Sequence, residues 1–353
     1  MSPNFSDNTN MDTIDFKKLS EQLRSELLRV NGWRKVVRTG SIAVYLFVFC
    51  WFMFVLFGGA LVSYIGLENY MQFTQYIIPV FIGFIVVNFV FTRCMTNFQE
   101  RESEAMQHIM STLFPTVYFS ASSQVDSRIL RDSKLFSASF SDPALAANTY
   151  GYIQFPHGEH SLHVADIGVS YGLLNKLQYN PVLGYFVMIY RFVLRPLFAS
   201  RLDSSPHNFR GMFAWCKIDM RFKGNIIILP DHLEQKIGYL AKNIQGLKKR
   251  YSARLLQLED QEFENYFAVY ADDEVEARML LTPAMMRHMT ALRQTFGCDI
   301  MLSFSRGTFY YAAVMPSGFL CVRPSALNDG KLLEDIYNDI SLSCKVAEEL
   351  RLN

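Results

Sequence analysis

Two long apolar segments stand out in the pattern of hydrophobic and polar positions along this chain. Residues 41–65 contain no charged side chain and are rich in Phe, Val and Leu. As a helix rising about 1.5 Å per residue, this segment is longer than the roughly 30 Å hydrocarbon core of a bilayer. Residues 76–92 are also uncharged but reach only about 25 Å, so they need neighbouring residues or a thin bilayer to cross. The pattern predicts a transmembrane helical hairpin over residues 41–92, with a hairpin buried in a soluble core as the alternative.

The distribution of basic residues predicts the orientation of this hairpin. Arg34, Lys35 and Arg38 precede the first apolar segment and Arg93 follows the second, whereas the connection between the segments contains no Lys or Arg. Lys and Arg in short flanking segments favour the cytoplasmic side of a membrane. We therefore expect Arg34, Lys35 and Arg38 at the membrane interface and both termini in the cytoplasm, with the lipid bilayer as one partner of the chain.

Amphipathic helices are predicted on both sides of the hairpin. Within the N-terminal segment, residues 1–40, apolar residues recur at helical spacing over residues 12–30. This helix could bind anionic lipid or a partner helix, or it could dock on a later part of the chain. After the hairpin the same spacing continues to Leu113, and Pro115 ends it, which predicts a helical stalk over residues 93–115.

Residues 116–353 contain short β-prone runs and helical segments. Apolar runs between turn residues predict strands at 150–155, 161–170, 209–220, 226–229, 267–271, 300–304, 308–314 and 319–322. Capping residues and periodicity predict helices at 124–131, 231–246, 273–281, 282–296 and from 328 onward. Residues 223–225 predict a turn that pairs the strands before and after it. The pattern is typical of a cytoplasmic α+β domain with an antiparallel sheet and flanking helices.

One segment of this domain, residues 180–200, is unusually apolar. Asn180 and Pro181 predict a helix start, and the helix that follows is apolar except for Arg191 and Arg195, which lie on one face. A third span would place Arg191 in hydrocarbon at a cost of about 2.5 to 3.5 kcal/mol. We expect a helix in the membrane interface with both arginines reaching lipid phosphates, or a buried or partner-binding helix.

The charge balance and the cysteines argue against several classes of function. Lys and Arg total 34 against 33 Asp and Glu, so no excess of positive charge indicates nucleic-acid binding. The six cysteines are scattered without a C-x-x-C pair, which fits a reducing compartment better than a zinc or disulfide framework. We predict no cofactor.

Residues 157–166 hold a cluster of potential metal ligands, in which His157, His160 and His163 accompany Glu159 and Asp166. Imidazole and carboxylate groups are common ligands of Zn²⁺. The alternative is a set of solvated turn histidines. His160 and His163 lie three positions apart on a predicted strand, so their side chains should point to opposite faces.

An acidic group follows a predicted strand near residue 271. Asp272, Asp273, Glu274 and Glu276 suggest acid–base chemistry or cation binding. The alternative role is structural, because Asp273 and Glu276 have the spacing of a helix capping box. The helix dipole also favours acidic residues at a helix start.

The stretch around this acidic group resembles the signature of DUF3137, a family of uncharacterised bacterial proteins. The residues that carry the resemblance are Phe263, Glu264, Phe267, Asp273, Glu276, Ala277, Arg278, Leu281, Thr282 and Pro283, preceded by Phe209, Arg210, Gly211, Gly224 and Pro230. Members similarly tend to carry two N-terminal spans, so the resemblance implies a multi-pass protein of the bacterial inner membrane. It implies no reaction, cofactor or catalytic residue.

Several motifs of common enzyme classes are missing from the sequence, including the phosphate loop, G-x-G-x-x-G and H-E-x-x-H. This favours a non-enzymatic function. The leading hypothesis is a membrane-tethered interaction, scaffold or sensor protein that binds a protein partner or its own copy at the inner membrane. The alternative hypothesis is a membrane-bound, metal-dependent hydrolase that uses residues 157–166.

Overall fold

The computed structural model divides the chain into two compact units. We call residues 23–105 and 177–204 the hairpin unit, and residues 1–22, 106–176 and 205–353 the sheet unit. The structure describes residues 16–64, 70–115, 117–136, 146–157, 160–170, 180, 183–184, 187, 209–218, 224–230, 254–256, 258–316, 318–320, 333–338 and 340–341. Arg191, Arg195 and most of the helix predicted over residues 180–200 lie outside this description.

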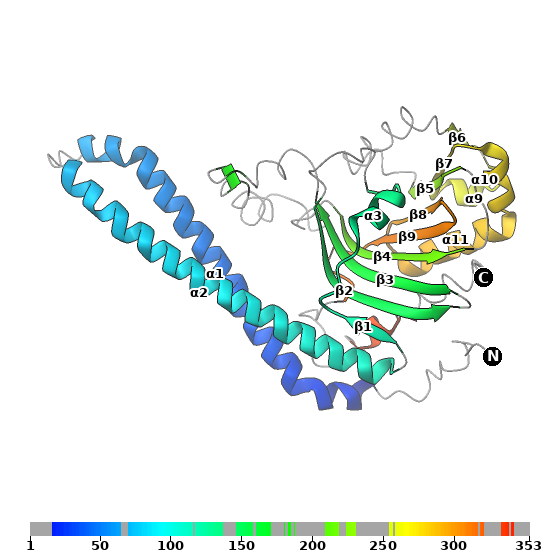
Figure 1. Cartoon of the computed structure of the whole chain (residues 1–353), viewed down its shortest axis with the longest axis horizontal. Coiled ribbons are helices and arrows are strands. Elements are labelled where there is room, and N and C mark those ends of the chain that lie inside the picture. The colour runs from blue at the N-terminus through cyan, green and yellow to red at the C-terminus, as the bar shows by residue number, and fades with distance from the viewer. Residues whose placement is uncertain are drawn as a thin grey trace. The chain divides into compact units, whose positions relative to one another are not determined.

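Two long helices provide most of the hairpin unit (Figure 1). α1 (Phe16–Tyr64) joins the predicted N-terminal helix to the first apolar segment without a break. α2 (Tyr70–Leu113) likewise joins the second apolar segment to the predicted stalk, and Pro115 follows its end. The boundaries expected at residues 40 and 92 are therefore positions within continuous helices.

Side-chain contacts pair α1 with α2 in the described part of the hairpin unit. Arg34 Nη2 donates a hydrogen bond to Glu102 Oε1 at 2.8 Å. Further along, a Cβ on Gly40 would meet the ring of Phe91 at 3.3 Å. The later residue of α1, Gly40, thus lies beside the earlier residue of α2, Phe91. The two helices therefore run antiparallel, as a helical hairpin requires.

The described residues include only part of the predicted transmembrane hairpin. Among them, no helix contains a stretch that is long and apolar enough to span a membrane. Most side chains between residues 48 and 82 lie outside the description. The structure thus supports two long helices over this region, and it does not support membrane crossing.

The sheet unit is built on an antiparallel sheet, which confirms the predicted α+β class (Figure 1). Among the described residues, nine strands follow the order β1-β2-β3-β4-β9-β8-β5-β7-β6. The strands are β1 (Tyr118–Ser120), β2 (Ala146–His157), β3 (His160–Ser170), β4 (Phe209–Lys217), β5 (Ile226–Pro230), β6 (Arg254–Leu256), β7 (Phe267–Ala271), β8 (Ile300–Ser305) and β9 (Thr308–Val314). The helices described around this sheet include α3 (Ser127–Asp132), α9 (Gln261–Glu264), α10 (Glu274–Leu280) and α11 (Pro283–Phe296).

The predicted pairing of the strands on either side of residues 223–225 is wrong. β4 pairs with β3 and β9, whereas β5 pairs with β7 and β8. The β8–β9 hairpin lies between β4 and β5 in the sheet. Its short turn, Arg306 and Gly307, pairs β8 with β9 locally. Phe319 and Leu320, predicted in a further strand, are buried but form no strand. Both sides of β9 are already paired.

The central strands are apolar on both sides of the sheet. On one face, Phe136 packs edge-on against Phe209 and Phe213, with ring centres 4.9 and 5.4 Å apart. On the other face, Met212 and Cys216 are fully buried and alternate with Phe213 along the strand predicted at 209–220. Both faces of β4 therefore contribute to the core, which excludes a sheet with one solvated face at this strand.

Gly211 of β4 lies close to the backbone of β9 and of Met315, the residue that follows β9. Its φ is 153°, and a Cβ there would overlap the carbonyl oxygen of Ala313 and lie 2.6 Å from the amide nitrogen of Met315. An added methyl group cannot fit without moving the backbone. This close approach gives a physical reason for glycine in the run Phe209-Arg210-Gly211.

We expect Gly211→Ala to lower the free energy of unfolding by about 3 kcal/mol, because it combines a positive φ with steric overlap. Gly297→Ala is the matched control. Gly297 also has a positive φ, 60°, but a Cβ there meets nothing within 4 Å, so the expected loss is about 1 kcal/mol. Urea unfolding of the full chain, followed by Trp215 fluorescence in a Trp33→Phe, Trp51→Phe background, measures both losses. Equal losses would contradict the steric explanation.

Candidate functional site

The predicted metal ligands are divided between the two faces of the sheet. His163 and Asp166 both lie on β3, but three positions apart, so their side chains leave opposite faces. His157 and His160 are paired across β2 and β3, and their side chains lie outside the described residues. Within the described part of the chain, no three His, Cys, Asp or Glu residues form a group that could hold a metal ion. The metal hypothesis remains a prediction for His157 and His160.

His163 belongs to a row of aromatic side chains across three strands. Its ring stacks on Trp215, with centres 5.0 Å apart and an angle of 13° between the planes. Its Nδ1 lies 2.6 Å from the hydroxyl of Tyr152. Burial lowers the pKa of His163, and the charge of Lys217 lowers it further, which favours a neutral imidazole at pH 7. Cross-strand aromatic packing accounts for this histidine.

Asp166 forms a buried ion pair with Arg210 of β4. Arg210 Nη1 lies 2.7 Å from Oδ1, and Nη2 donates to Oδ2 at 2.8 Å. The backbone N–H of Leu320 also donates to Oδ2, at 3.1 Å. The guanidinium lies 3.7 Å from the ring centre of Tyr150, which is the extra residue at a β-bulge in β2. The pair thus fastens the segment after β9 to β3 and β4.

Burial raises the pKa of Asp166 to about 6, although Arg210 and the backbone N–H groups of Phe319 and Leu320 oppose the shift. Loss of hydration therefore outweighs the attraction of the nearby cation. Removal of one partner from a buried pair costs about 3 to 5 kcal/mol, because the other charge stays buried. These properties identify the pair as a structural element of the sheet unit.

We expect the free energy of unfolding to fall as pH rises through about 6, because the Asp166 carboxyl loses its proton over this range. Its folded-state pKa is about 6 and its ordinary value is 3.8, so the folded state holds the proton more tightly. The stabilisation that this proton provides is fully present below the ordinary pKa of Asp166 and is lost above the raised pKa. Asp166→Asn should remove this dependence, and Arg210→Met should enlarge it. Urea unfolding between about pH 4 and pH 7 measures the effect, and identical profiles for wild type and Asp166→Asn would contradict it.

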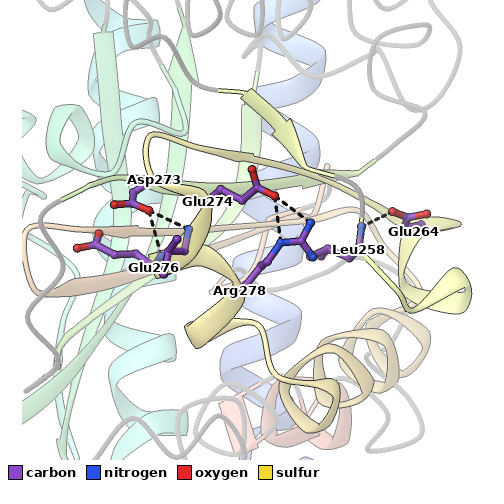
Figure 2. Close-up of polar contacts among 7 residues, drawn as sticks. Leu258, Glu264, Asp273, Glu274, Glu276 and Arg278 are labelled. Atoms are coloured by element: carbon purple, nitrogen blue, oxygen red, sulfur yellow. Dashed lines mark hydrogen bonds and ion pairs between the residues drawn. The ribbon is translucent and has the colours of Figure 1, made fainter.

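The acidic residues of the family signature hold a helix and a loop in place (Figure 2). Asp273 is the N-cap of α10 and accepts hydrogen bonds from the N–H groups of Val275 and Glu276 at 2.8 and 3.3 Å. Glu276 accepts a hydrogen bond from the N–H of Gly224 at 3.0 Å, which joins α10 to the loop before β5. The capping role predicted for Asp273 is confirmed.

Other charged residues of the signature make similar local contacts. Glu264 accepts a hydrogen bond from the N–H of Leu258 at 2.6 Å. Arg278 donates to Glu274, four positions earlier on α10, at 3.0 and 3.1 Å (Figure 2). Both Arg278 and Glu274 are exposed, so this pair contributes little to stability.

The remaining signature residues form core contacts and a second helix cap. Phe263 and Ala277 are fully buried, and the ring of Phe263 lies 5.0 Å from that of Phe267. Thr282 caps α11 by accepting from the N–H of Met285, and Pro283 occupies the first turn. Helix caps, loop contacts and apolar packing therefore explain the signature without catalysis.

Four segments meet at one end of the sheet, and we call them the loop junction: residues 132–134 at the end of α3, 224–225 before β5, 272–273 after β7, and 305–307 at the turn from β8 to β9. Asn225 Nδ2 donates to Asp272 at 2.7 Å, and Ser305 Oγ donates to Asn225 Oδ1 at 2.7 Å. Arg306 Nη1 lies 3.1 Å from Asp132 Oδ1. These contacts bring polar groups from distant parts of the chain together.

Two basic residues of the loop junction have backbone conformations that favour glycine. Lys134 has φ 61° and Arg306 has φ 52°, and they are the non-glycine residues with positive φ in the described part of the chain. Lys134 follows the end of α3, where glycine is preferred. Arg306 is the first residue of a two-residue hairpin turn, where Asn or Gly is preferred. The sequence predicts strands at 300–304 and 308–314 on either side of this turn, but it assigns no function to either basic side chain, because hydrophobic periodicity carries no information about φ.

The two basic side chains differ in exposure. Lys134 is 6% exposed, whereas the side chain of Arg306 is 72% exposed. Burial lowers the pKa of Lys134, the charge of Arg306 lowers it further, and Asp132 and Asp272 oppose the shift. Because strained non-glycine residues concentrate at binding and catalytic sites, the loop junction is the candidate functional site.

The fold and the site define a class of protein, an antiparallel α+β domain preceded in the chain by two long helices. Residues 207–352 match the family described as "Protein of unknown function (DUF3137)". This match confirms, over that part of the chain, the resemblance drawn from the signature residues. The solved structure of the mycobacterial trehalose monomycolate transport factor A, TtfA, is similar with 7% identity and a TM-score of 0.33, over 67% of this chain and 94% of that one. No curated protein matches the chain in sequence.

Proposed function

We propose that this chain is a membrane-tethered interaction protein. In this proposal the hairpin unit enters the bacterial inner membrane, and the sheet unit binds a protein partner or a second copy on the cytoplasmic side. The observation that carries the proposal is a set of apolar side chains, each 45 to 61% exposed, on both helices of the hairpin unit. We call it the apolar belt, and it consists of Ile42, Leu46, Phe47, Val86, Val87, Phe89 and Val90.

The two halves of the apolar belt lie at similar levels along the antiparallel helices. The approach of Gly40 to Phe91 places the residues that follow Gly40 beside those that precede Phe91. Single exposed apolar residues are ordinary on a protein surface, but a contiguous apolar surface indicates contact with a membrane or a protein. The belt also falls within the two uncharged segments of the sequence, which supports the bilayer as its surroundings.

Basic residues border the apolar belt on the side of the chain termini. The guanidinium of Arg93 lies 5.5 Å from the ring centre of Phe89, and Lys35 and Arg38 are exposed. Basic and aromatic residues favour the membrane–water interface. Arg34, also expected at the interface, forms an ion pair with α2. This arrangement supports cytoplasmic termini.

The proposed interaction surface is the loop junction. The edge strands β1 and β6 contain three residues each, which makes addition of a partner strand unfavourable. Loops held by a rigid sheet commonly carry recognition, and the hydrogen bonds of Asn225 and Ser305 hold this junction. A protein partner or a second copy is the class of ligand that this proposal assigns to the tethered domain.

We expect Asn69→Cys in the full chain to react with a membrane-impermeant maleimide in intact spheroplasts, because the proposed hairpin places its connection outside the cell. Lys35→Cys is the control, and it should react only after permeabilisation. The wild-type chain supplies the baseline of its native cysteines. Equal labelling of both variants, or release of the protein from membranes by alkaline carbonate without detergent, would contradict the tether.

We also expect chemical crosslinking in native membranes to capture one stoichiometric protein, or a second copy of the chain, with links to the sheet unit. Mass spectrometry of the linked peptides identifies both the captured protein and the surface. A chain recovered solely as a monomer in gentle detergent, with no crosslinked protein, would count against the interaction proposal.

A further inference from the structure

Arg93 of α2 lies at the border of the apolar belt, and its side chain extends toward the belt. The guanidinium carbon is 5.5 Å from the ring centre of Phe89, four positions earlier on the helix. Phe89 is 61% exposed and Val90 is 55% exposed, and these residues are the surface neighbours of Arg93 on that side. The positive charge of Arg93 is therefore held over exposed apolar surface.

Polar surroundings lie in the opposite direction along α2. Thr96 and Asn97, three and four positions after Arg93, are both exposed. Helical side chains incline toward the N-terminus of their own helix. In the proposed hairpin this inclination directs Arg93 of α2 into the bilayer, whereas Lys35 and Arg38 of α1 incline toward the cytoplasm. Arg93 thus differs from the other basic residues that border the belt.

An arginine held over the apolar belt needs an anion beside it in a bilayer. Transfer of an unpaired guanidinium out of water is unfavourable, and basic side chains usually avoid it by extending to the interface. Among the described residues Arg93 forms no ion pair. The sequence has no Asp or Glu between Glu26 and Glu68, or between Glu68 and Glu100. These observations favour an anion from the bilayer itself, where lipid phosphate groups are the available anions.

We propose that Arg93 binds the phosphate of an anionic phospholipid in the cytoplasmic leaflet, with Phe89 as a positioning residue; this inference rests on the proposed membrane tether. The planar guanidinium can donate parallel hydrogen bonds to phosphate oxygens. The ring face of Phe89 holds the guanidinium over the belt. The acyl chains of the same lipid can cover Val86 and Val90, which are 56 and 55% exposed. One molecule thus satisfies both the charge and the apolar surface.

The neighbouring positive charge favours a lipid with a net negative charge. Gly40 of α1 approaches Phe91 of α2. Arg38 precedes Gly40 by two positions and Arg93 follows Phe91 by two, a displacement of about 3 Å along each helix in the same direction. The two arginines therefore lie at similar levels, and together they repel the ammonium group of a zwitterionic headgroup. Phosphatidylglycerol has a phosphate and no ammonium group, so it is the probe for this site.

Native mass spectrometry of the full chain, taken in mild detergent from vesicles with equal amounts of phosphatidylglycerol and phosphatidylcholine, tests the site. We expect the wild type to retain phosphatidylglycerol preferentially. Arg93→Gln should lower the ratio of retained phosphatidylglycerol to phosphatidylcholine about tenfold, the loss expected for one charge-assisted hydrogen bond. Far-UV circular dichroism should be unchanged, because Arg93 is exposed.

Lys35→Gln is the matched control for Arg93→Gln. Lys35 is also an exposed basic residue that borders the belt, and it contributes equally to the orientation of the hairpin. Its side chain inclines away from the belt, so the lipid ratio should stay close to that of the wild type. An equal fall in Lys35→Gln and Arg93→Gln would indicate a general attraction between basic residues and anionic lipid, and it would overturn the inference.

Two substitutions of Phe89 test its positioning role. Phe89→Leu keeps the belt apolar but removes the ring, so it should lower the lipid ratio, though less than Arg93→Gln does. Phe89→Trp keeps a ring face that binds a guanidinium at least as well, so it should retain the wild-type ratio. Equal ratios in the two variants would contradict the role assigned to Phe89.

Solid-state NMR of the full chain in phosphatidylglycerol vesicles identifies the ligand group directly. Dephasing of arginine guanidinium ¹³C by lipid ³¹P should decrease in Arg93→Gln, and equal dephasing in the wild type and this variant would overturn the inference. Excess inorganic phosphate should leave the retained phosphatidylglycerol in place. Its displacement would show a site for free phosphate and would also overturn the inference.

The outcomes separate this inference from the proposed function. If alkaline carbonate releases the wild-type chain from membranes without detergent, the proposed tether fails and the lipid site fails with it. If the chain stays in the membrane and the wild type shows no preference for phosphatidylglycerol, only the lipid site fails. The same holds if Arg93→Gln keeps the wild-type ratio.

Discussion

The pairing of β4 with β9 is the interaction on which the sheet unit depends. It joins the strands from β1 to β4 with those from β5 to β9. The pairing continues beyond β9, where the N–H of Met315 donates to the carbonyl of Arg210 at 2.9 Å, and this approach requires Gly211. The side chain of Arg210 then holds the buried carboxylate of Asp166. One strand thus supplies the junction of the two halves, a close backbone approach and the buried cation, and the apolar cluster that spans both halves forms around it.

The signature of DUF3137 describes how this part of the sheet unit is held together. Asp273 and Thr282 cap helices, Glu276 binds the loop before β5, and Phe263 fills the core. Residues with such roles are required for folding whatever the domain binds. The signature therefore accounts for the fold of this part of the chain without naming a ligand, and the proposed function assigns recognition to the loops that the signature positions.

The loop junction and the apolar belt are sites of different character. In the proposed function, recognition at the junction would depend on polar and charged groups that loop contacts hold in place, so it would be sensitive to salt and to single substitutions. In the proposed function the belt would act through many weak apolar contacts, so no single side chain would dominate it. A tethered interaction protein needs both properties, because the anchor must be permanent and recognition must be selective.

The sequence by itself determined the elements whose causes lie within a few residues. The long helices follow from apolar periodicity, the caps at Asp273 and Thr282 from residue type and spacing, and the β8–β9 hairpin from a two-residue turn. The tertiary structure alone decided the strand order, because the β8–β9 hairpin separates β4 from β5. It also brought Arg210 to Asp166, 44 positions away. Lys134 and Arg306 meet for the same reason: contact between distant segments depends on which strands pair, and local periodicity does not specify that.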